Sequence, residues 1–293
     1  MFGSDHSGSD PLGGGSDQLI PSRGILASRP YRSRPALPFR PERIVLAKGA
    51  LECPSGQELV HSICTAYPRA VVSERFDAPH NRIDLGACDP LELHDRGKKT
   101  LVIGVHHSAV RQSSEAGNTC PNYWHFSPYG FCPYRCHYCY LAGTRGVRFS
   151  PTVKIFVNLD EILAEIDRVA RRLNRPTAFY LGKLQDGLAL DPLTGYSRRM
   201  IPFFAAHPFA RLALLTKSAD VANLLDVEHR NRTILSWTLT PDAIARRFAP
   251  GSGLLCAWIP SSTASPIPIS SWTVSSRPHE IAASAAFQQA SCS

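Results

Sequence analysis

Short apolar runs and amphipathic stretches follow one another along the first third of the chain. The apolar runs predict strands at residues 43–47, 70–72 and 100–105. Between the first two of these strands, Pro54 begins a segment whose apolar residues have helical spacing, which predicts a helix. We therefore interpret residues 39–110 as a small N-terminal α/β unit.

The middle of the chain repeats a strand–helix rhythm. Asp160 is a candidate N-cap for a helix with one apolar face. Further strands and helices are predicted after it, with strands at 177–182, 212–216 and 233–239 and helices at 198–206 and 221–225. Strands that alternate with helices indicate parallel βα units, hence an open sheet or a barrel with its chemistry at the C-terminal strand ends. We assign residues 111–250 to this part.

The two ends of the chain lack this pattern. Residues 1–38 are rich in Gly, Ser, Pro and Arg, and we expect a disordered arm. Its arginines are typical of a solvated linker, and a phosphate-contacting arm is the alternative. Residues 251–293 form an irregular Ser-rich tail in which Arg277 and Glu280 alone are of the Asp, Glu, Lys or Arg type. We interpret this tail as out of frame or otherwise aberrant, with a native disordered tail as the alternative.

Composition narrows the class of protein. The 293 residues are 43% hydrophobic and carry a formal net charge of +8, which excludes a wholly disordered chain and permits a nucleic-acid partner. No apolar run approaches the ~20 residues of a membrane span. The acidic start of the chain has no apolar core and predicts neither a signal nor a transit peptide. Nine cysteines without a secretion signal indicate reduced thiols, so we expect a cytoplasmic protein.

Three of these cysteines carry the strongest chemical signal. Cys132, Cys136 and Cys139 have the spacing C-x₃-C-x₂-C. Three thiolates can fill three corners of an iron–sulfur cubane and leave the fourth iron open for a chelating substrate or cofactor. Zinc held by the three thiols and either His137 or His125 is an alternative. Three thiols without a metal role are the remaining alternative.

This spacing, followed by an aromatic residue, resembles the signature of radical S-adenosylmethionine enzymes. The resemblance implies that Cys132, Cys136 and Cys139 ligate a [4Fe-4S] cluster whose open iron binds the amino and carboxylate groups of S-adenosylmethionine. Reductive cleavage of this cofactor gives a 5′-deoxyadenosyl radical that abstracts hydrogen from the substrate. An external one-electron reductant such as flavodoxin or ferredoxin is also implied.

Further segments resemble the spore photoproduct lyase family. They are, in chain order, residues 136–141, 215–217, 223–226 and 248–251. Members of that family are DNA repair enzymes that reverse a thymine dimer by hydrogen abstraction, so the resemblance implies a lyase acting on a lesion in DNA or a related nucleic acid. The family's fold is a partial six-stranded barrel. This sequence supplies about four of those strands before residue 251, and we expect a partial, truncated radical-SAM (β/α) barrel.

The resemblance also assigns roles to single residues. Tyr138 and Tyr140 stand at the family's tyrosines, which are proposed there to relay a hydrogen atom. Lys217 matches the lysine that holds the carboxylate of S-adenosylmethionine, and a solvated lysine is the alternative. Asp186 matches an acidic residue after the second barrel strand. Tyr138, Asp186 and Lys217 are therefore the cofactor-binding candidates.

The sequence departs from the family at the position of the hydrogen donor. Where the repair enzymes have a donor cysteine, three residues before the acid, this chain has Lys183, and Gln185 replaces a serine. A lysine cannot donate a hydrogen atom in the way that a thiol does, so we expect impaired repair by the family's route. A radical S-adenosylmethionine enzyme with a different substrate is the first alternative function, and a zinc-stabilised nucleic-acid-binding module is the second.

Overall fold

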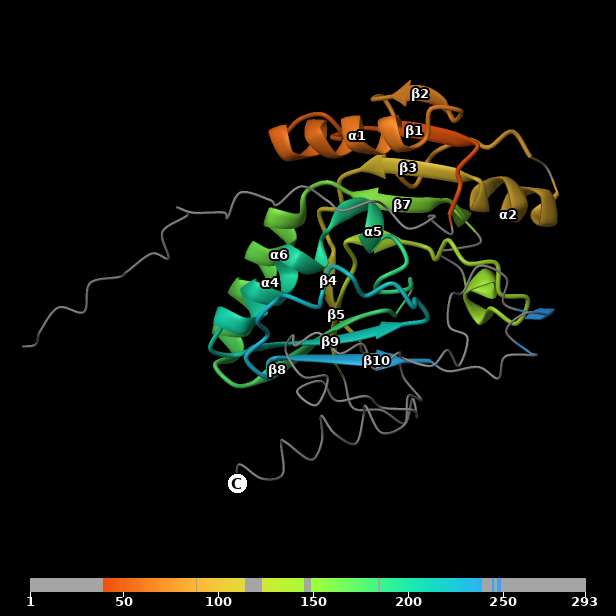
Figure 1. Ribbon diagram of the computed structural model, residues 1–293. Helices are drawn as coiled ribbons and strands as arrows, with labels where there is room; N and C mark the ends of the chain where they lie inside the picture. Colours follow the sequence, from red (N-terminus) through yellow and green to blue (C-terminus); the bar gives the residue numbers. More distant parts are fainter. Residues whose placement is uncertain are drawn as a thin grey trace, which may run out of the picture. The chain divides into compact units, whose positions relative to one another are not determined.

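The computed structural model describes residues 39–87, 89–113, 123–144, 149–183, 185–238, 244 and 247–248. The expectations for the arm at residues 1–38 and for the tail at residues 251–293 lie outside these residues. The described chain forms two five-stranded sheets with helices beside them (Figure 1).

The first sheet consists mainly of parallel strands. Its order is β2 (Val71–Arg75), β1 (Arg43–Ala47), β3 (Thr100–Gly104), β7 (Val153–Phe156) and β6 (Tyr129–Gly130). The last of these strands, β6, is antiparallel to β7. The unit expected at residues 39–110 supplies three of the five strands, whereas β7 and β6 come from later in the chain. After β4 (Val110–Gln112) and β5 (Trp124–Phe126) in the second sheet, the chain thus returns to the first sheet. There the wholly buried strand β7 pairs with β3, which is also wholly buried.

The second sheet has the same number of strands. Its order is β10 (Thr233–Trp237), β9 (Ala210–Thr216), β8 (Thr177–Leu181), β5 (Trp124–Phe126) and β4 (Val110–Gln112). The first four pair in parallel, and β4 is antiparallel to β5. The α/β fold class predicted from the strand–helix rhythm is confirmed by these parallel strands.

Three of the helices follow the predicted periodicity. They are α1 (Pro54–Ala66), α4 (Leu159–Leu173) and α6 (Ser197–Ala206). The predicted cap of α4 is wrong, because Asn158 occupies the N-cap position and the Asp160 carboxylate pairs with Arg199 instead. Residues 221–225 form a turn rather than the expected helix. No helix in the described ranges is long and apolar enough to cross a membrane.

A further helix, α2 (Pro90–Lys98), was not expected from the apolar pattern because its mean hydropathy is low. Its start is set locally, since the Asp89 carboxylate accepts hydrogen bonds from the backbone N–H groups of Leu91 and Glu92, each at 2.9 Å. Two shorter helical segments are α5 (Asp191–Thr194) and the 3₁₀ turn η1 (Tyr140–Gly143).

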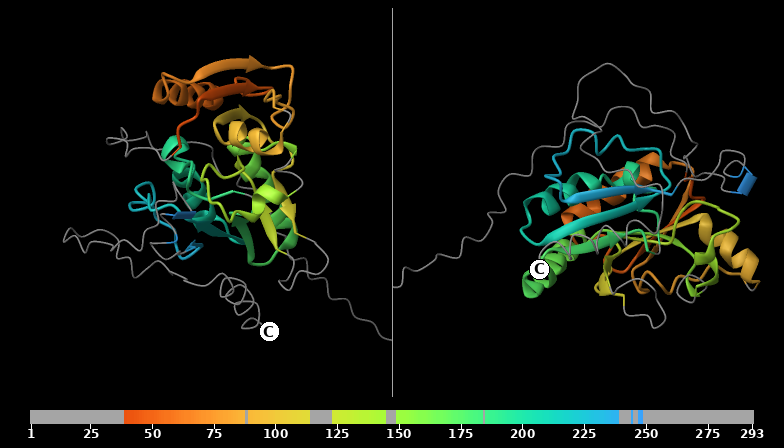
Figure 2. Two further views of the ribbon diagram at one scale, coloured as in Figure 1. Left: turned by 90° about the vertical axis from the view of Figure 1, so that its right-hand side faces the viewer. Right: turned by 90° about the horizontal axis from the view of Figure 1, so that it is seen from below.

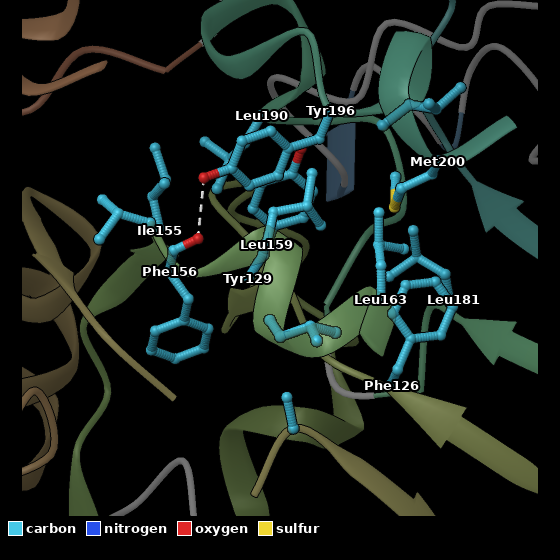
Figure 3. Close-up of a cluster of buried hydrophobic side chains, with 14 of the residues drawn as sticks. Phe126, Tyr129, Ile155, Phe156, Leu159, Leu163, Leu181, Leu190, Tyr196 and Met200 are labelled. Atoms are coloured by element: carbon cyan, nitrogen blue, oxygen red, sulfur yellow. Dashed lines mark hydrogen bonds between the residues drawn. The ribbon is translucent and has the colours of Figure 1, made fainter. Parts of the chain in front are cut away.

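The main hydrophobic core contains side chains from both sheets and from α4. The rings of Tyr129 and Tyr196 stack in it with centroids 5.5 Å apart (Figure 3). Their phenols are satisfied within the core, because the Tyr196 hydroxyl donates to the carbonyl of Phe156 at 2.8 Å and the Tyr129 hydroxyl lies 2.6 Å from Thr194 Oγ1. This core fixes β6, and with it the start of the segment that carries the cysteines.

The two sheets run in opposite directions. In Figure 1, β3 and β7 point to the left and β9 and β10 point to the right. The N-terminal ends of the first sheet and the C-terminal ends of the second therefore lie on one side of the molecule. Helix α2 and the turn η1 lie on that side as well (Figure 1).

A buried carboxylate connects α5 to the turn at residues 222–226. Asp191 is 2% exposed and accepts hydrogen bonds from the backbone and hydroxyl of Ser197 and from Asn223 Nδ2, the last at 2.9 Å. In the same turn, Asp226 pairs with Arg198 at the surface, at 2.6 Å.

The substitution Asn223→Ala removes a donor from a buried carboxylate, and we expect it to lower the free energy of unfolding by about 1–3 kcal/mol. Asp226→Ala, the matched control in the same turn, removes an exposed ion pair and is expected to cost less than about 1 kcal/mol. Urea denaturation of both variants measures the difference. Equal losses would contradict the role of Asp191 as the anchor of this turn.

Candidate active site at the cysteine loop

The three cysteines lie in one loop, residues 131–144, which we call the cysteine loop. It leaves β6, ends in η1, and lies on the side where the second sheet has its C-terminal ends (Figures 1 and 2). The backbone N–H of Cys139 donates to the carbonyl of Cys136 at 3.1 Å, which closes a tight turn between these two residues.

The three thiols are half-buried and form no disulfide. Burial raises the pKa of Cys132 above its ordinary value, as does the nearby Asp186 carboxylate, while Lys98 lowers it. Burial also raises the pKa of Cys136, which Lys217 lowers and Cys139 raises further. The thiols are thus electrostatic neighbours, yet among the described residues no three such donors stand close enough to hold a metal ion. Their chemistry fits an iron–sulfur cluster, because thiolates are the ligands that such clusters use.

Asp186 lies at the C-terminal end of the second sheet and is 8% exposed. One carboxylate oxygen accepts from Thr216 Oγ1 at 2.6 Å and from the backbone N–H groups of Leu188 and Ala189. The other accepts from the backbone N–H of Lys217 at 2.5 Å. Burial raises the pKa of Asp186, and these donors oppose that rise. The carboxylate therefore joins the turn after β8 to the end of β9, within the protein.

Lys217 leaves the end of β9 and reaches the cysteine loop. Its Nζ lies 6.0 Å from the centre of the Tyr138 ring. The lysine also acts electrostatically on Cys136. The structure thus brings together Lys217, Tyr138 and the cysteines, which are about 80 residues apart in the sequence.

The two candidate tyrosines differ in exposure. Tyr138 is 48% exposed and faces Lys217, whereas Tyr140 is 76% exposed at the start of η1. Tyr140 nevertheless lies close enough to Tyr180, on β8, to contribute to the raised pKa of that phenol, whose main cause is burial. Tyr180 is an aromatic neighbour of Tyr140 and Asp186 that sequence reasoning missed, and its place in an apolar strand gave no signal.

Lys183 follows β8 and lies close to residues that flank β4 and β5 in the second sheet. Its Nζ donates to Ser113 Oγ at 3.0 Å and lies 5.7 Å from the centre of the Tyr123 ring. Gln185 is 4% exposed, and its Nε2 lies 3.4 Å from the carbonyl of Phe126. Both residues that depart from the family's pattern therefore belong to the same edge of the sheet as Asp186.

Phe248, which follows β10 in the chain, lies against the cysteine loop. The backbone N–H of His137 donates to the carbonyl of Phe248 at 2.7 Å, and the two rings meet edge-on with centroids 6.3 Å apart. Phe248 is the described residue of the segment 248–251, which resembles the family in sequence. This contact places Phe248 beside the cysteines.

Helix α2 covers the other side of the loop. Lys98, its last residue, donates to the carbonyls of Cys132 and Tyr134, and Asp95 pairs with Arg135. Sequence reasoning missed these residues, although the Asp89 cap and the two lysines at residues 98–99 were visible in the sequence.

The connection between Asp186 and β9 can be tested by stability. Thr216→Val removes the hydroxyl that donates to Asp186 at 2.6 Å and accepts from Ser218 N at 2.9 Å. We expect the free energy of unfolding to fall by about 1–3 kcal/mol because a buried acceptor loses its donor. Thr177→Val is the matched control, since its hydroxyl donates to the nearby carbonyl of Arg175 at the surface. A loss for Thr216→Val no larger than for the control, in urea denaturation, would contradict this role.

Comparison with known proteins places this site in a family. The family model described as spore photoproduct lyase matches residues 39–265. Spore photoproduct lyase of Bacillus subtilis is 30% identical over 221 residues, which are 74% of this chain and 61% of that protein. The Geobacillus enzyme is 29% identical over 218 residues, again 61% of its length. The chain thus matches 61% of the length of these curated relatives.

Solved structures of spore photoproduct lyase give the same result. One, complexed with dinucleoside spore photoproduct, has a TM-score of 0.62 and 27% identity over 73% of this chain and 61% of that one. Another, with the same TM-score and coverage, is a mutant with bound AdoMet and dinucleoside spore photoproduct. The resemblance found at the cysteine spacing is confirmed, and the chain belongs to the spore photoproduct lyase family.

Proposed function

We propose that this chain is a radical S-adenosylmethionine enzyme that acts on a thymine lesion in DNA or a related nucleic acid. One observation carries the proposal: Lys217, fixed through its backbone by Asp186, reaches the loop that holds Cys132, Cys136 and Cys139. A cation at a strand end beside three thiols is suited to a cofactor that carries a carboxylate and binds an open iron.

The residues of the site then have distinct tasks. Cys132, Cys136 and Cys139 would hold a [4Fe-4S] cluster, which supplies an open iron and the electron for cleavage of S-adenosylmethionine. Lys217 binds the carboxylate of that cofactor, and Asp186 fixes the backbone from which Lys217 extends. Among the cofactor-binding candidates, Asp186 acts through Lys217, because its oxygens are engaged by protein donors.

Tyr138 and Tyr140 are proposed to relay a hydrogen atom. Tyr138 lies beside Lys217 and interacts with Cys136, so it would line the site that holds the cofactor. Tyr140 is near Tyr180 on β8. The electron is expected to come from an external donor such as flavodoxin or ferredoxin, in the cytoplasm.

A different substrate is the second candidate, and Lys183 favours it. Its ammonium group, held by Ser113 Oγ at 3.0 Å, places a fixed positive charge where the family's donor thiol would stand. A cation in this place suits a substrate with an anionic group beside the reacting carbon.

Anaerobic reconstitution with iron and sulfide tests the cluster. We expect a brown protein with four iron atoms per chain, which is the content of one such cluster. In Cys136→Ala we expect the iron content to fall to roughly half or less, because two thiolates hold the cluster weakly. Cys64→Ala on α1 is the control and should load fully. A colourless protein with one bound zinc per chain would instead support the zinc-stabilised nucleic-acid-binding module.

Lys183→Cys tests whether the donor is the missing part. With reduced enzyme, S-adenosylmethionine and irradiated DNA, we expect restored thymine to rise by about tenfold or more over wild type, since a thiol donates hydrogen readily. Lys183→Ser is the control, because it removes the charge without adding a thiol. Formation of 5′-deoxyadenosine shows that each variant is loaded. If the cysteine variant forms 5′-deoxyadenosine but restores no more thymine than the serine variant, the thymine lesion is not the substrate.

A further inference from the structure

Lys98 is a buried cation pressed against the cysteine loop. It is 4% exposed, and its Nζ donates to the carbonyl of Tyr134 at 2.7 Å and to the carbonyl of Cys132. The same ammonium lies 3.6 Å from the centre of the Phe131 ring. In the part of the chain that the structure describes, Lys98 forms no ion pair with a carboxylate.

The surrounding contacts hold the loop in an unusual backbone conformation. Phe131 has a φ of +52°, in the left-handed region that a bulky residue rarely adopts because of steric strain. Its ring is held by the Lys98 ammonium and by an edge-on contact with His94, with centroids 5.7 Å apart. Phe131 is also buried against Leu141 at the far end of the loop. The backbone that presents Cys132 is thus set by α2.

Helix α2 contacts the loop at a second point, and we call the contacts at both points the grip of α2. Asp95, one turn before Lys98, pairs with Arg135, and it also pairs with Lys99 at 3.0 Å. Residues 94, 95 and 98 of one helix therefore contact residues 131, 132, 134 and 135 of the loop. A grip of this kind could be made with neutral side chains, so the buried charge of Lys98 needs its own explanation.

The charges around Lys98 provide that explanation. A buried ammonium is costly unless negative charge balances it. Burial lowers the pKa of Lys98, and the three cysteines of the loop, Cys132, Cys139 and Cys136, oppose this lowering in their thiolate form. Metal-bound cysteines are thiolates, so the charge of Lys98 is balanced when the loop carries its metal.

We propose that Lys98 is a positioning residue that fixes the backbone at Cys132 and supplies the positive charge that favours the reduced form of the iron–sulfur cluster. This inference rests on the proposed function. Reduction adds an electron to a site next to a fixed cation in a medium of low dielectric constant, where the attraction is weakly screened. Removing the cation therefore makes the cluster harder to reduce.

Two substitutions separate the charge from the hydrogen bonds. Lys98→Gln keeps N–H donors and removes the charge, whereas Lys98→Met removes both. Lys48→Met, on the exposed residue after β1, is the control for the loss of a lysine. The midpoint potential of the reconstituted cluster is measured by a dithionite titration followed by electron paramagnetic resonance. Cleavage of the metal-free chain by trypsin after Arg135 reports on the grip of α2.

For Lys98→Gln we expect full iron content and about a tenfold lower equilibrium constant for one-electron reduction, which is a potential about 59 mV more negative. For Lys98→Met we expect, in addition, faster cleavage after Arg135 in the metal-free chain. Lys48→Met should match wild type in both measurements.

A Lys98→Gln variant that loads fully at the wild-type potential would overturn the electrostatic role. Wild-type cleavage after Arg135 in Lys98→Met would overturn the positioning role. Lys98→Gln could also load no cluster while Lys48→Met loads one, and the cleavage of metal-free Lys98→Gln after Arg135 then decides. A wild-type cleavage rate supports the role of the charge. A rate equal to that of Lys98→Met contradicts the role of the charge. Failure of wild type itself to form a cluster contradicts the proposed function, and the cleavage of the metal-free variants still tests the grip of α2.

Discussion

The carboxylate of Asp186 must be satisfied at the point where two parallel strands end, and the geometry of the site depends on how this is done. A buried carboxylate without donors would cost several kcal/mol. Thr216, the backbone of Lys217 and two backbone N–H groups of the following turn supply those donors. Satisfying Asp186 therefore fixes the end of β9, and Lys217 projects from that fixed point toward the cysteine loop.

The opposite strand directions of the two sheets bring helix α2 to the site. Because the two sheets run in opposite directions, the helix that precedes β3 lies on the same side as the C-terminal ends of β8 and β9 (Figure 1). The cysteine loop is held between them, by Lys98 on one side and by the end of β9 on the other. Two cations, Lys98 at the end of α2 and Lys217 after β9, thus act on the thiols of the loop, and both lower the pKa of Cys136 against the effect of burial.

Local patterns predicted most of the strands and the chemistry of the loop. Buried parallel strands are continuous apolar runs, which is why β1, β3, β8 and β9 were found. The strand β7 was missed because its Lys154 interrupts the apolar run, although that side chain is 6% exposed and bonds the carbonyls of Ser150 and Thr152. Helix α2 was missed because it buries few apolar side chains, even though its cap at Asp89 was visible.

By itself, the sequence determined the family resemblance and the α/β class, and it predicted thiols as the metal ligands, because spacing and periodicity are local properties. It also showed Lys183 in place of a thiol, since a single position in a motif can be read without a fold. Only the tertiary structure decided that β7 completes the first sheet, that Asp186 binds the backbone of Lys217 and that Lys98 lies beneath Cys132. These contacts join residues about 30 to 50 positions apart, and a long-range contact is fixed by packing and by the satisfaction of buried polar groups rather than by any local pattern.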